Sequence, residues 1–277
     1  MRAHLAEVLP PGASTAQAWR WRDQQGATCN EALAEEVPVA LVFNGISHAV
    51  MMATPDHLED FALGFALTEG LIDSAQDLYG VEALPIEGGI ELQLEVSASA
   101  AWRLKERRRT LAGRTGCGLC GTDSLQQVRR ALPAVAALTV SAQAVTRAEA
   151  QLHDWQLLQR ITGSTHAAAW ADLNGDIQCV REDVGRHNAL DKLVGALVRQ
   201  HADTREGFVL VTSRASFEMV QKTVALGAGL LAAVSAPTAW AVSCAQEANL
   251  CLAGFVRSGK LTAYTFADRL TSEIKEN

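Results

Sequence analysis

Two cysteines three positions apart are the residues of this chain best suited to covalent chemistry. Cys117 and Cys120 form the only Cys-x-x-Cys motif of the sequence and lie in the glycine-rich run 113–121. Glycine leaves the backbone mobile and the sulfur atoms uncovered. Upstream lies a basic run made of Arg103, Lys105, Arg107, Arg108, Arg109 and Arg114. Positive charge favours thiolate over thiol, so the sequence predicts exposed, activated sulfur.

A helix that follows the cysteines is expected to act in the same direction. Asp123 and Gln126 have the spacing of a capping box, which predicts a helix over residues 124–132. The partial positive charge at the start of that helix points toward Cys120 and lowers thiol pKa values.

A Cys-x-x-Cys pair is compatible with three classes of site. Structural zinc needs two further ligands, and the sequence has no second Cys-x-x-Cys or paired-histidine motif. A thioredoxin-like redox pair is expected at a helix start directly after a strand, whereas these cysteines lie in a glycine-rich loop. A sulfur carrier needs an accessible thiolate that accepts persulfide sulfur and presents it to an acceptor. The carrier hypothesis fits best, with redox exchange or zinc binding as the alternative.

Composition limits the remaining possibilities. A chain of 277 residues exceeds the usual size of one domain, and its net charge of −7 argues against general nucleic-acid binding. No apolar stretch is long enough to span a bilayer, and charge and proline interrupt the first ten residues before a signal-peptide core forms. We therefore expect a cytoplasmic protein without a membrane partner. In that reducing setting the other cysteines are expected to be free buried thiols: Cys29, Cys179, Cys244 and Cys251.

The first half of the chain has a mixed pattern of strands and helices. Apolar runs at 39–43 and 48–52 flank Asn44-Gly45, which is the strongest short hairpin signal. A helix is expected over 58–71, a half-buried strand over 90–96, and a basic helix over 101–112. These elements predict an α+β domain over residues 1–142 that ends with the Cys-x-x-Cys loop.

The second half alternates helix and strand more regularly. The predicted helices are 146–161, 187–201, 217–226 and 238–248, and the predicted strands are 166–173, 177–181, 208–212, 230–234, 250–256 and 261–266. The central strands are apolar without alternation, which is typical of a largely parallel sheet covered on both faces. The sequence therefore predicts a three-layer α/β domain over residues 143–277.

Polar residues gather where predicted strands of the second half meet helices. Residues 181–192 lie at such a turn, and open α/β sheets bind ligands at the carboxyl ends of their strands. The alternative is a cap in which Asp183, Arg186 and Asp191 pair with one another. Residues 213–216 could hold a phosphate or polar ring, or Ser216 could simply cap a helix. His166 is either catalytic or a hydrogen-bonded strand residue.

Six blocks of the sequence resemble a known family. Residues 39–55, 58–65, 113–121, 181–192, 213–222 and 233–238 are similar to the formate dehydrogenase accessory sulfurtransferases, the FdhD/NarQ family, in family order. The resemblance runs from about residue 37 to the C-terminus. It implies a cytoplasmic homodimer that takes persulfide sulfur from a cysteine desulfurase. The sulfur would then pass to the molybdenum of the bis(molybdopterin guanine dinucleotide) cofactor before insertion into formate dehydrogenase.

The resemblance also implies roles for individual residues. Cys117 matches the persulfide-forming cysteine and Cys120 its partner, and no structural metal is expected. The stretch implied to contact the molybdenum cofactor and its guanine nucleotide moiety is Phe255, Val256, Arg257, Ser258, Gly259 and Lys260. Phe255 and Val256 can also be read as the end of a buried strand.

The second domain is implied to have a cytidine-deaminase-like fold without deaminase chemistry. Deaminases need a His-x-Glu and a later Cys-x-x-Cys, whereas His166 precedes two alanines and follows the Cys-x-x-Cys.

Overall fold

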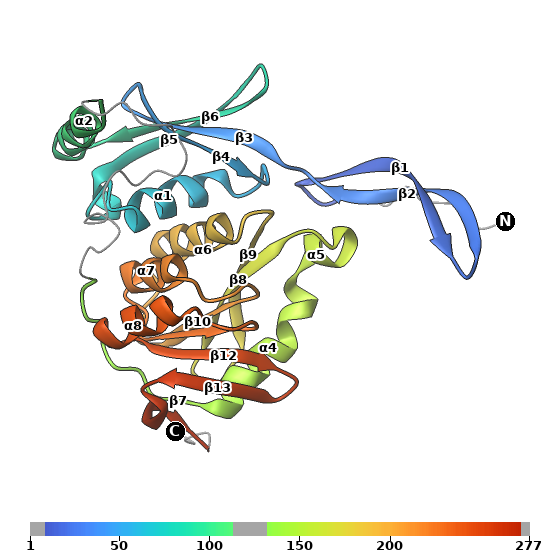
Figure 1. Ribbon diagram of the computed structural model, residues 1–277. Coiled ribbons are helices and arrows are strands. Elements are labelled where there is room, and N and C mark those ends of the chain that lie inside the picture. The colour runs from blue at the N-terminus through green and yellow to red at the C-terminus, as the bar shows by residue number, and fades with distance from the viewer. Residues whose placement is uncertain (1–8, 113–131, 273–277) are drawn as a thin grey trace.

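The N-terminal part of the protein begins with a two-stranded arm. The computed structural model describes residues 9–112 and 132–272. Strands β1 (Ala13–Arg22) and β2 (Gln25–Ala34) pair antiparallel and extend away from the body (Figure 1). The arm was not predicted from the sequence, because most of its side chains are exposed and leave no one-sided apolar pattern.

A four-stranded sheet follows the arm. Its strands are β3 (Val37–Phe43), β4 (Ile46–Ala53), β5 (Leu78–Ile86) and β6 (Gly89–Val96), in the order β4-β3-β6-β5. Asn44 and Gly45 have φ values of 45° and 77°, the left-handed geometry that a tight two-residue hairpin turn requires. The predicted hairpin and the strand at 90–96 are therefore confirmed, whereas β5 was not predicted.

Two helices complete this part. Helix α1 (Leu58–Thr68) packs Phe61 and Phe65 against Leu41 and Leu92 of the sheet in one apolar cluster. Helix α1 ends near Gly70, whose φ of 62° is left-handed, so it is slightly shorter than predicted. Helix α2 (Ala98–Ala112) confirms the predicted basic helix and begins three residues earlier.

The second part is built on a six-stranded sheet. Its strands are β8 (His166–Asp172), β9 (Ile177–Asp183), β10 (Gly207–Val211), β11 (Leu230–Ala233), β12 (Cys251–Arg257) and β13 (Lys260–Thr265), in the order β13-β12-β11-β10-β8-β9. Strands β10, β11 and β12 are parallel, and the other pairings are antiparallel. The prediction of a parallel centre is confirmed.

Helices cover both faces of this sheet. Helices α6 (Arg186–Arg199), α7 (Phe217–Leu226) and α8 (Ala239–Glu247) pack on one face, and α4 (Ala142–Trp155) packs on the other. The predicted three-layer α/β architecture is confirmed, whereas the implied likeness to the cytidine deaminase fold stays a prediction. The short strands β7 (Val140–Ser141) and β14 (Leu270–Thr271) form a further parallel pair.

The helix predicted over 146–161 is wrong in one respect, because it is two helices. Helix α4 ends at Trp155. The next residue, Gln156, has a ψ of 78°, which lies outside the helical region, and α5 (Leu157–Thr162) starts after it in a new direction. The Glu182 carboxylate accepts hydrogen bonds of 2.8 Å from the N–H groups of both Leu158 and Gln159. This side chain from β9 satisfies the start of α5, which local sequence patterns do not reveal.

Helices α1 and α6 join the two parts of the molecule (Figure 1). A Cβ atom on Gly64 would lie 1.8 Å from the Asp191 carbonyl oxygen, and one on Gly195 would lie 1.9 Å from the Asp60 carbonyl oxygen. Only glycine allows the two backbones to approach this closely. The helices form a layer between the two sheets, while a domain boundary at residue 142 stays a prediction.

Candidate functional site

The Cys-x-x-Cys loop lies outside the described residues. Cys117, Cys120 and the capping-box helix predicted after them therefore remain predictions. Helix α2 precedes this loop in the chain. It carries two members of the basic run whose side chains the structure describes, Arg103 and Lys105. Arg103 forms a 3.0 Å ion pair with Asp73.

The four cysteines that the structure does describe are free thiols in unfavourable surroundings for a thiolate. Cys179 and Cys251 are buried, and Cys29 and Cys244 are half-buried. Burial raises the pKa of Cys251 to about 11 and also raises the pKa of Cys179. Burial and the Glu247 charge raise the pKa of Cys244. The pKa of Cys29 is raised by partial burial and by a hydrogen bond to Glu31.

The carboxyl edge of the six-stranded sheet gathers several of the predicted functional residues. Strands β10, β11 and β12 end there, and the antiparallel β8 and β13 begin there. His166, Thr212, Arg257 and Lys260 consequently lie along one edge. Ligands of open α/β sheets bind at such an edge, so this is the candidate functional face of the domain.

The turn between β12 and β13 presents most of the predicted cofactor-contact residues to solvent. Phe255 is 41% exposed and its ring lies 6.0 Å from the Arg257 guanidinium. Ser258 and Gly259 have φ values of 51° and 72°, and the space around Gly259 is open. Val256 is buried, so its side chain faces the core and the exposed chemistry of the turn comes from its neighbours.

The residues after β10 form a polar cluster with the start of α6. Ser216 precedes α7 but makes no side-chain capping bond; its hydroxyl donates to the Glu218 carboxylate at 3.0 Å. His187 lies 3.2 Å from the same carboxylate. The Ser213 hydroxyl donates to the Arg214 carbonyl at 3.1 Å. Ser216 therefore occupies the N-cap position of α7, as the helix-cap interpretation predicted, but its hydroxyl bonds to Glu218 and does not cap the helix backbone.

Residues 181–192 connect the two parts of the molecule through buried ion pairs. Lys192 and Asp183 are both fully buried, with 2.7 Å between Nζ and Oδ2. Lys192 also donates to the Thr54 carbonyl at 2.9 Å, and Asp183 accepts from the Thr54 N–H at 3.0 Å. Burial lowers the pKa of Lys192 although Asp183 opposes the shift.

A second group of charges lies beside this pair. Asp191 accepts from the Thr68 hydroxyl at 2.6 Å and pairs with Lys222 at 2.9 Å. Burial alone would lower the pKa of Lys222, but the Asp191 and Glu69 carboxylates outweigh burial, and the pKa is raised. Lys222 is therefore charged.

The third group confirms that these charges bridge the two halves of the chain. Arg181 and Arg199 both pair with Asp60 of α1, at 2.7 and 2.8 Å. The hypothesis that Asp183, Arg186 and Asp191 pair with one another is wrong, because the partners of the two carboxylates are lysines, backbone N–H groups, the Asn188 amide and the Thr68 hydroxyl. Lys192 lies in the same run, but Thr54, Thr68 and Lys222 are distant in sequence, so spacing within 181–192 could not identify them.

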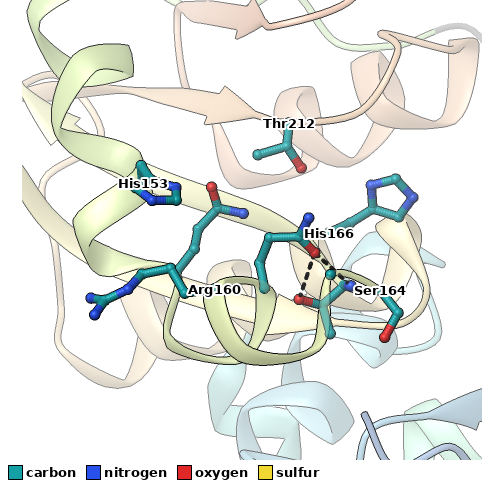
Figure 2. Close-up of a pocket in the computed structure, with 9 residues that line it drawn as sticks. His153, Arg160, Ser164, His166 and Thr212 are labelled. Carbon is teal, nitrogen blue, oxygen red and sulfur yellow. Dashed lines mark hydrogen bonds between the residues drawn. The ribbon is translucent and has the colours of Figure 1, made fainter. Parts of the chain in front are cut away.

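A polar cavity of about 600 Å³ opens at the same edge, on the face covered by α4 and α5 (Figure 2). Sequence reasoning placed only His166 near this region. The residues that line the cavity are His153, Gln156, Gln159, Arg160, Gly163, Ser164, Thr165, His166 and Thr212. Figure 2 shows His153 and Arg160 on one side and His166 and Ser164 on the other. Burial and the nearby Arg186 lower the pKa of His166.

Comparison with known proteins identifies the group to which this chain is related. A family model described as the FdhD/NarQ family matches residues 34–271. The chain belongs to the FdhD/NarQ family. A relative from Cupriavidus necator named sulfur carrier protein FdhD is 57% identical over 273 residues, covering 98% of this chain and 94% of the relative. A Bordetella petrii relative of the same name is 57% identical over 245 residues, covering 88% of each chain.

A solved structure of a protein described as a formate dehydrogenase accessory protein, from Desulfotalea psychrophila, has the same fold. Its TM-score is 0.76 at 20% identity, and the match covers 94% of this chain and 100% of the other. The family resemblance drawn from the sequence is confirmed, and so is its mixed α/β fold.

Two properties of the described residues are relevant to the alternatives. No group of three or more His, Cys, Asp or Glu side chains within 9–112 and 132–272 could hold a metal ion. Since both motif cysteines lie outside these ranges, the zinc alternative is not tested. No helix in the same ranges is long and apolar enough to cross a membrane.

Proposed function

We propose that this protein is a sulfur carrier for the maturation of formate dehydrogenase, and that Cys117 bears the sulfur. The observation that carries the proposal is membership of the FdhD/NarQ family, whose relatives are named sulfur carriers, in a chain with one glycine-flanked Cys-x-x-Cys. Sulfur transfer requires an accessible thiolate, and the basic run before the loop favours one.

The other cysteines support this assignment by elimination. All four have raised pKa values and are buried or half-buried, so at neutral pH they are poor nucleophiles. The sulfur-bearing role therefore falls to the Cys-x-x-Cys pair. Cys120 either relays the sulfur or shapes the loop around Cys117.

The proposed reaction is a sulfurtransferase cycle in two steps. The Cys117 thiolate attacks the terminal sulfur of a persulfide on a cysteine desulfurase. A new S–S bond forms on Cys117 as the old one breaks, and the desulfurase cysteine leaves as a thiolate. The S–S bond on Cys117 then breaks as the terminal sulfur bonds to the molybdenum of the bis(molybdopterin guanine dinucleotide) substrate. Two electrons from molybdenum in its reduced Mo(IV) state convert this sulfur to a sulfido ligand, the metal becomes Mo(VI), and Cys117 returns to the thiolate. Formate dehydrogenase would receive the sulfurated cofactor.

The turn between β12 and β13 is the proposed contact for the guanine nucleotide part of that substrate. Arg257 and Lys260 offer two cations for its phosphates, and the open space at Gly259 allows close approach of the backbone. The exposed Phe255 ring offers a stacking surface beside them. We also propose that the protein acts as a homodimer in the cytoplasm, as the family resemblance implies.

Intact-protein mass spectrometry tests the carrier step. After incubation with a cysteine desulfurase and cysteine, the protein should gain one sulfur atom, and peptide mapping should place it on Cys117. Cys117→Ala should abolish the gain, whereas the matched control Cys244→Ala should retain it. Normal sulfur loading of Cys117→Ala would show that the assignment is wrong. One tightly held zinc per chain, with unfolding on chelation, would favour the structural alternative instead.

Calorimetry with GDP tests the cofactor contact separately. Replacing Arg257 and Lys260 together by alanine should weaken GDP binding while sulfur loading of Cys117 stays intact. Each lost charged hydrogen bond is expected to cost roughly 1.5 to 3 kcal/mol of binding free energy. Unchanged GDP affinity in the double variant, at fixed salt, would exclude this turn.

A further inference from the structure

The cavity between α4, α5 and the start of β8 contains hydrogen-bonding groups that the proposed sulfur transfer does not use. Gln156 is only 7% exposed, and its side-chain amide has no hydrogen-bond partner among the described residues. The amide atoms of Gln156 are not among the fully buried side-chain atoms of the described residues that lack a partner, so the amide faces the open space of the cavity and is available to a ligand there. Gln156 lines the cavity, so the cavity is where a partner for its amide can be placed.

The other groups around the cavity are mainly donors. Arg160 brings a permanent positive charge, and Ser164 and Thr212 bring hydroxyls. The Thr212 hydroxyl accepts from the Ala167 N–H at 3.0 Å and donates to the Ala167 carbonyl at the longer distance of 3.4 Å, and these two contacts fix its position at the rim. None of the nine described lining residues carries a carboxylate. Such a surface attracts anions and does not repel them.

The nearest carboxylate of this region is already satisfied. Both oxygens of Glu182 accept backbone hydrogen bonds from the start of α5, and one also accepts from the Thr165 hydroxyl at 3.0 Å. A second cation lies close by, because Arg186 is among the charges that lower the pKa of His166. The Arg186 Nε is buried without a hydrogen-bond partner among the residues described. Arg160 and Arg186 therefore place two cations near the cavity on a chain that is acidic as a whole.

We propose that this cavity is an oxyanion site that binds a phosphate or diphosphate group, held by Arg160, Gln156 and Thr212. Its existence does not depend on the sulfur-carrier function. Two sources of the group share this chemistry, a free anion and the phosphates of a larger ligand. The second is geometrically open, because the turn after β12 lies two strands from Thr212 along the same edge. Adjacent strands are about 4.8 Å apart, so β10 and β12 are about 10 Å apart across the sheet.

Titration of the full-length protein with pyrophosphate, followed by calorimetry at fixed low salt, tests the proposal. The wild-type protein should bind pyrophosphate when the anion is present at millimolar concentration. Arg160→Gln should weaken binding about tenfold, the equivalent of about 1.4 kcal/mol. The matched control is Arg147→Gln, an exposed arginine on α4 that pairs with Asp176 outside the cavity. The control should bind like the wild type.

A second variant excludes a general loss of charge as the cause. Gln156→Leu keeps the net charge and side-chain size, and it should also weaken pyrophosphate binding while the circular dichroism spectrum stays unchanged. Absence of pyrophosphate binding by the wild type, or equal binding by Arg160→Gln and Arg147→Gln, would overturn the proposal. So would Gln156→Leu with full affinity.

GDP distinguishes the two sources of the anion. If Arg160→Gln weakens GDP binding as well as pyrophosphate binding, the site takes phosphates of a nucleotide. If it weakens pyrophosphate binding alone, the site takes a free anion. Either result supports the oxyanion site, and neither involves Cys117, so failure of this proposal is distinguishable from failure of the proposed function.

Discussion

Replacing Lys192 by methionine is expected to destabilise the protein strongly. Lys192→Met keeps the length of the side chain and much of its packing but removes its charge. The lysine and Asp183 are both fully buried, and the change deprives the carboxylate of its 2.7 Å ion pair. Removing one partner of a buried pair costs roughly 3 to 5 kcal/mol, because the other charge is left uncompensated.

The hydrogen bonds that Asp183 keeps determine where in this range the loss of unfolding free energy falls. Asp183 still accepts from the N–H groups of Thr54 and Gly185 and from the Asn188 amide, at 3.0, 2.7 and 3.0 Å. These three donors stabilise the remaining carboxylate and favour the lower end of the range. The Thr54 carbonyl loses its bond from Lys192 as well, which adds about 1 kcal/mol. We therefore expect a loss of about 4 kcal/mol in the free energy of unfolding.

Urea denaturation followed by tryptophan fluorescence and far-ultraviolet circular dichroism measures this loss. The matched control is Arg205→Met, because the Arg205–Asp203 pair is largely exposed and such pairs contribute about 0 to 1 kcal/mol. In the double variant Lys192→Met/Asp183→Asn no buried charge is left alone, so its loss should be smaller than the sum of the two single losses. A loss for Lys192→Met no larger than that of Arg205→Met would refute the reasoning.

Local geometry supports three further predictions. Gly64→Ala should destabilise the protein by several kcal/mol, because the new Cβ would lie 1.8 Å from the Asp191 carbonyl oxygen. The control Gly80→Ala should cost little in the same denaturation assay, because the nearest atom to its Cβ would lie 3.9 Å away. Ser141→Ala removes the hydroxyl that caps α4 at 2.9 Å and should cost about 1 kcal/mol, measured by thermal unfolding. Burial and Arg186 lower the folded-state pKa of His166, so the unfolded state binds its proton more readily. The free energy of unfolding should therefore fall as pH drops below about 6.5, the ordinary histidine pKa. His166→Gln should make this pH dependence less steep. An unchanged pH dependence in that variant would contradict its attribution to His166.

Local sequence patterns determined most of the secondary structure of this protein. Asn44-Gly45 predicted the hairpin because its left-handed turn needs residues of this type, and apolar strands without alternation predicted a sheet covered on both faces. The block around Cys117, together with five others, indicated the family from residue types and their order alone. These features depend on residues close together in the chain, so local patterns were sufficient to predict them.

Tertiary structure decided what joins the two parts and where a ligand cavity lies. The residues at 181–192 were expected either to bind a ligand or to form a cap in which Asp183, Arg186 and Asp191 pair with one another. Asp183 instead pairs with Lys192 and Thr54, and Asp191 with Lys222 and Thr68, so Thr54 and Thr68 of the other half of the chain complete both groups. The cavity beside Gln156 lies where α4 gives way to α5, and the Glu182 side chain accepts hydrogen bonds from the start of α5. These contacts join residues far apart in sequence, and the free energy of burying charge selects them only once the fold has brought those residues together.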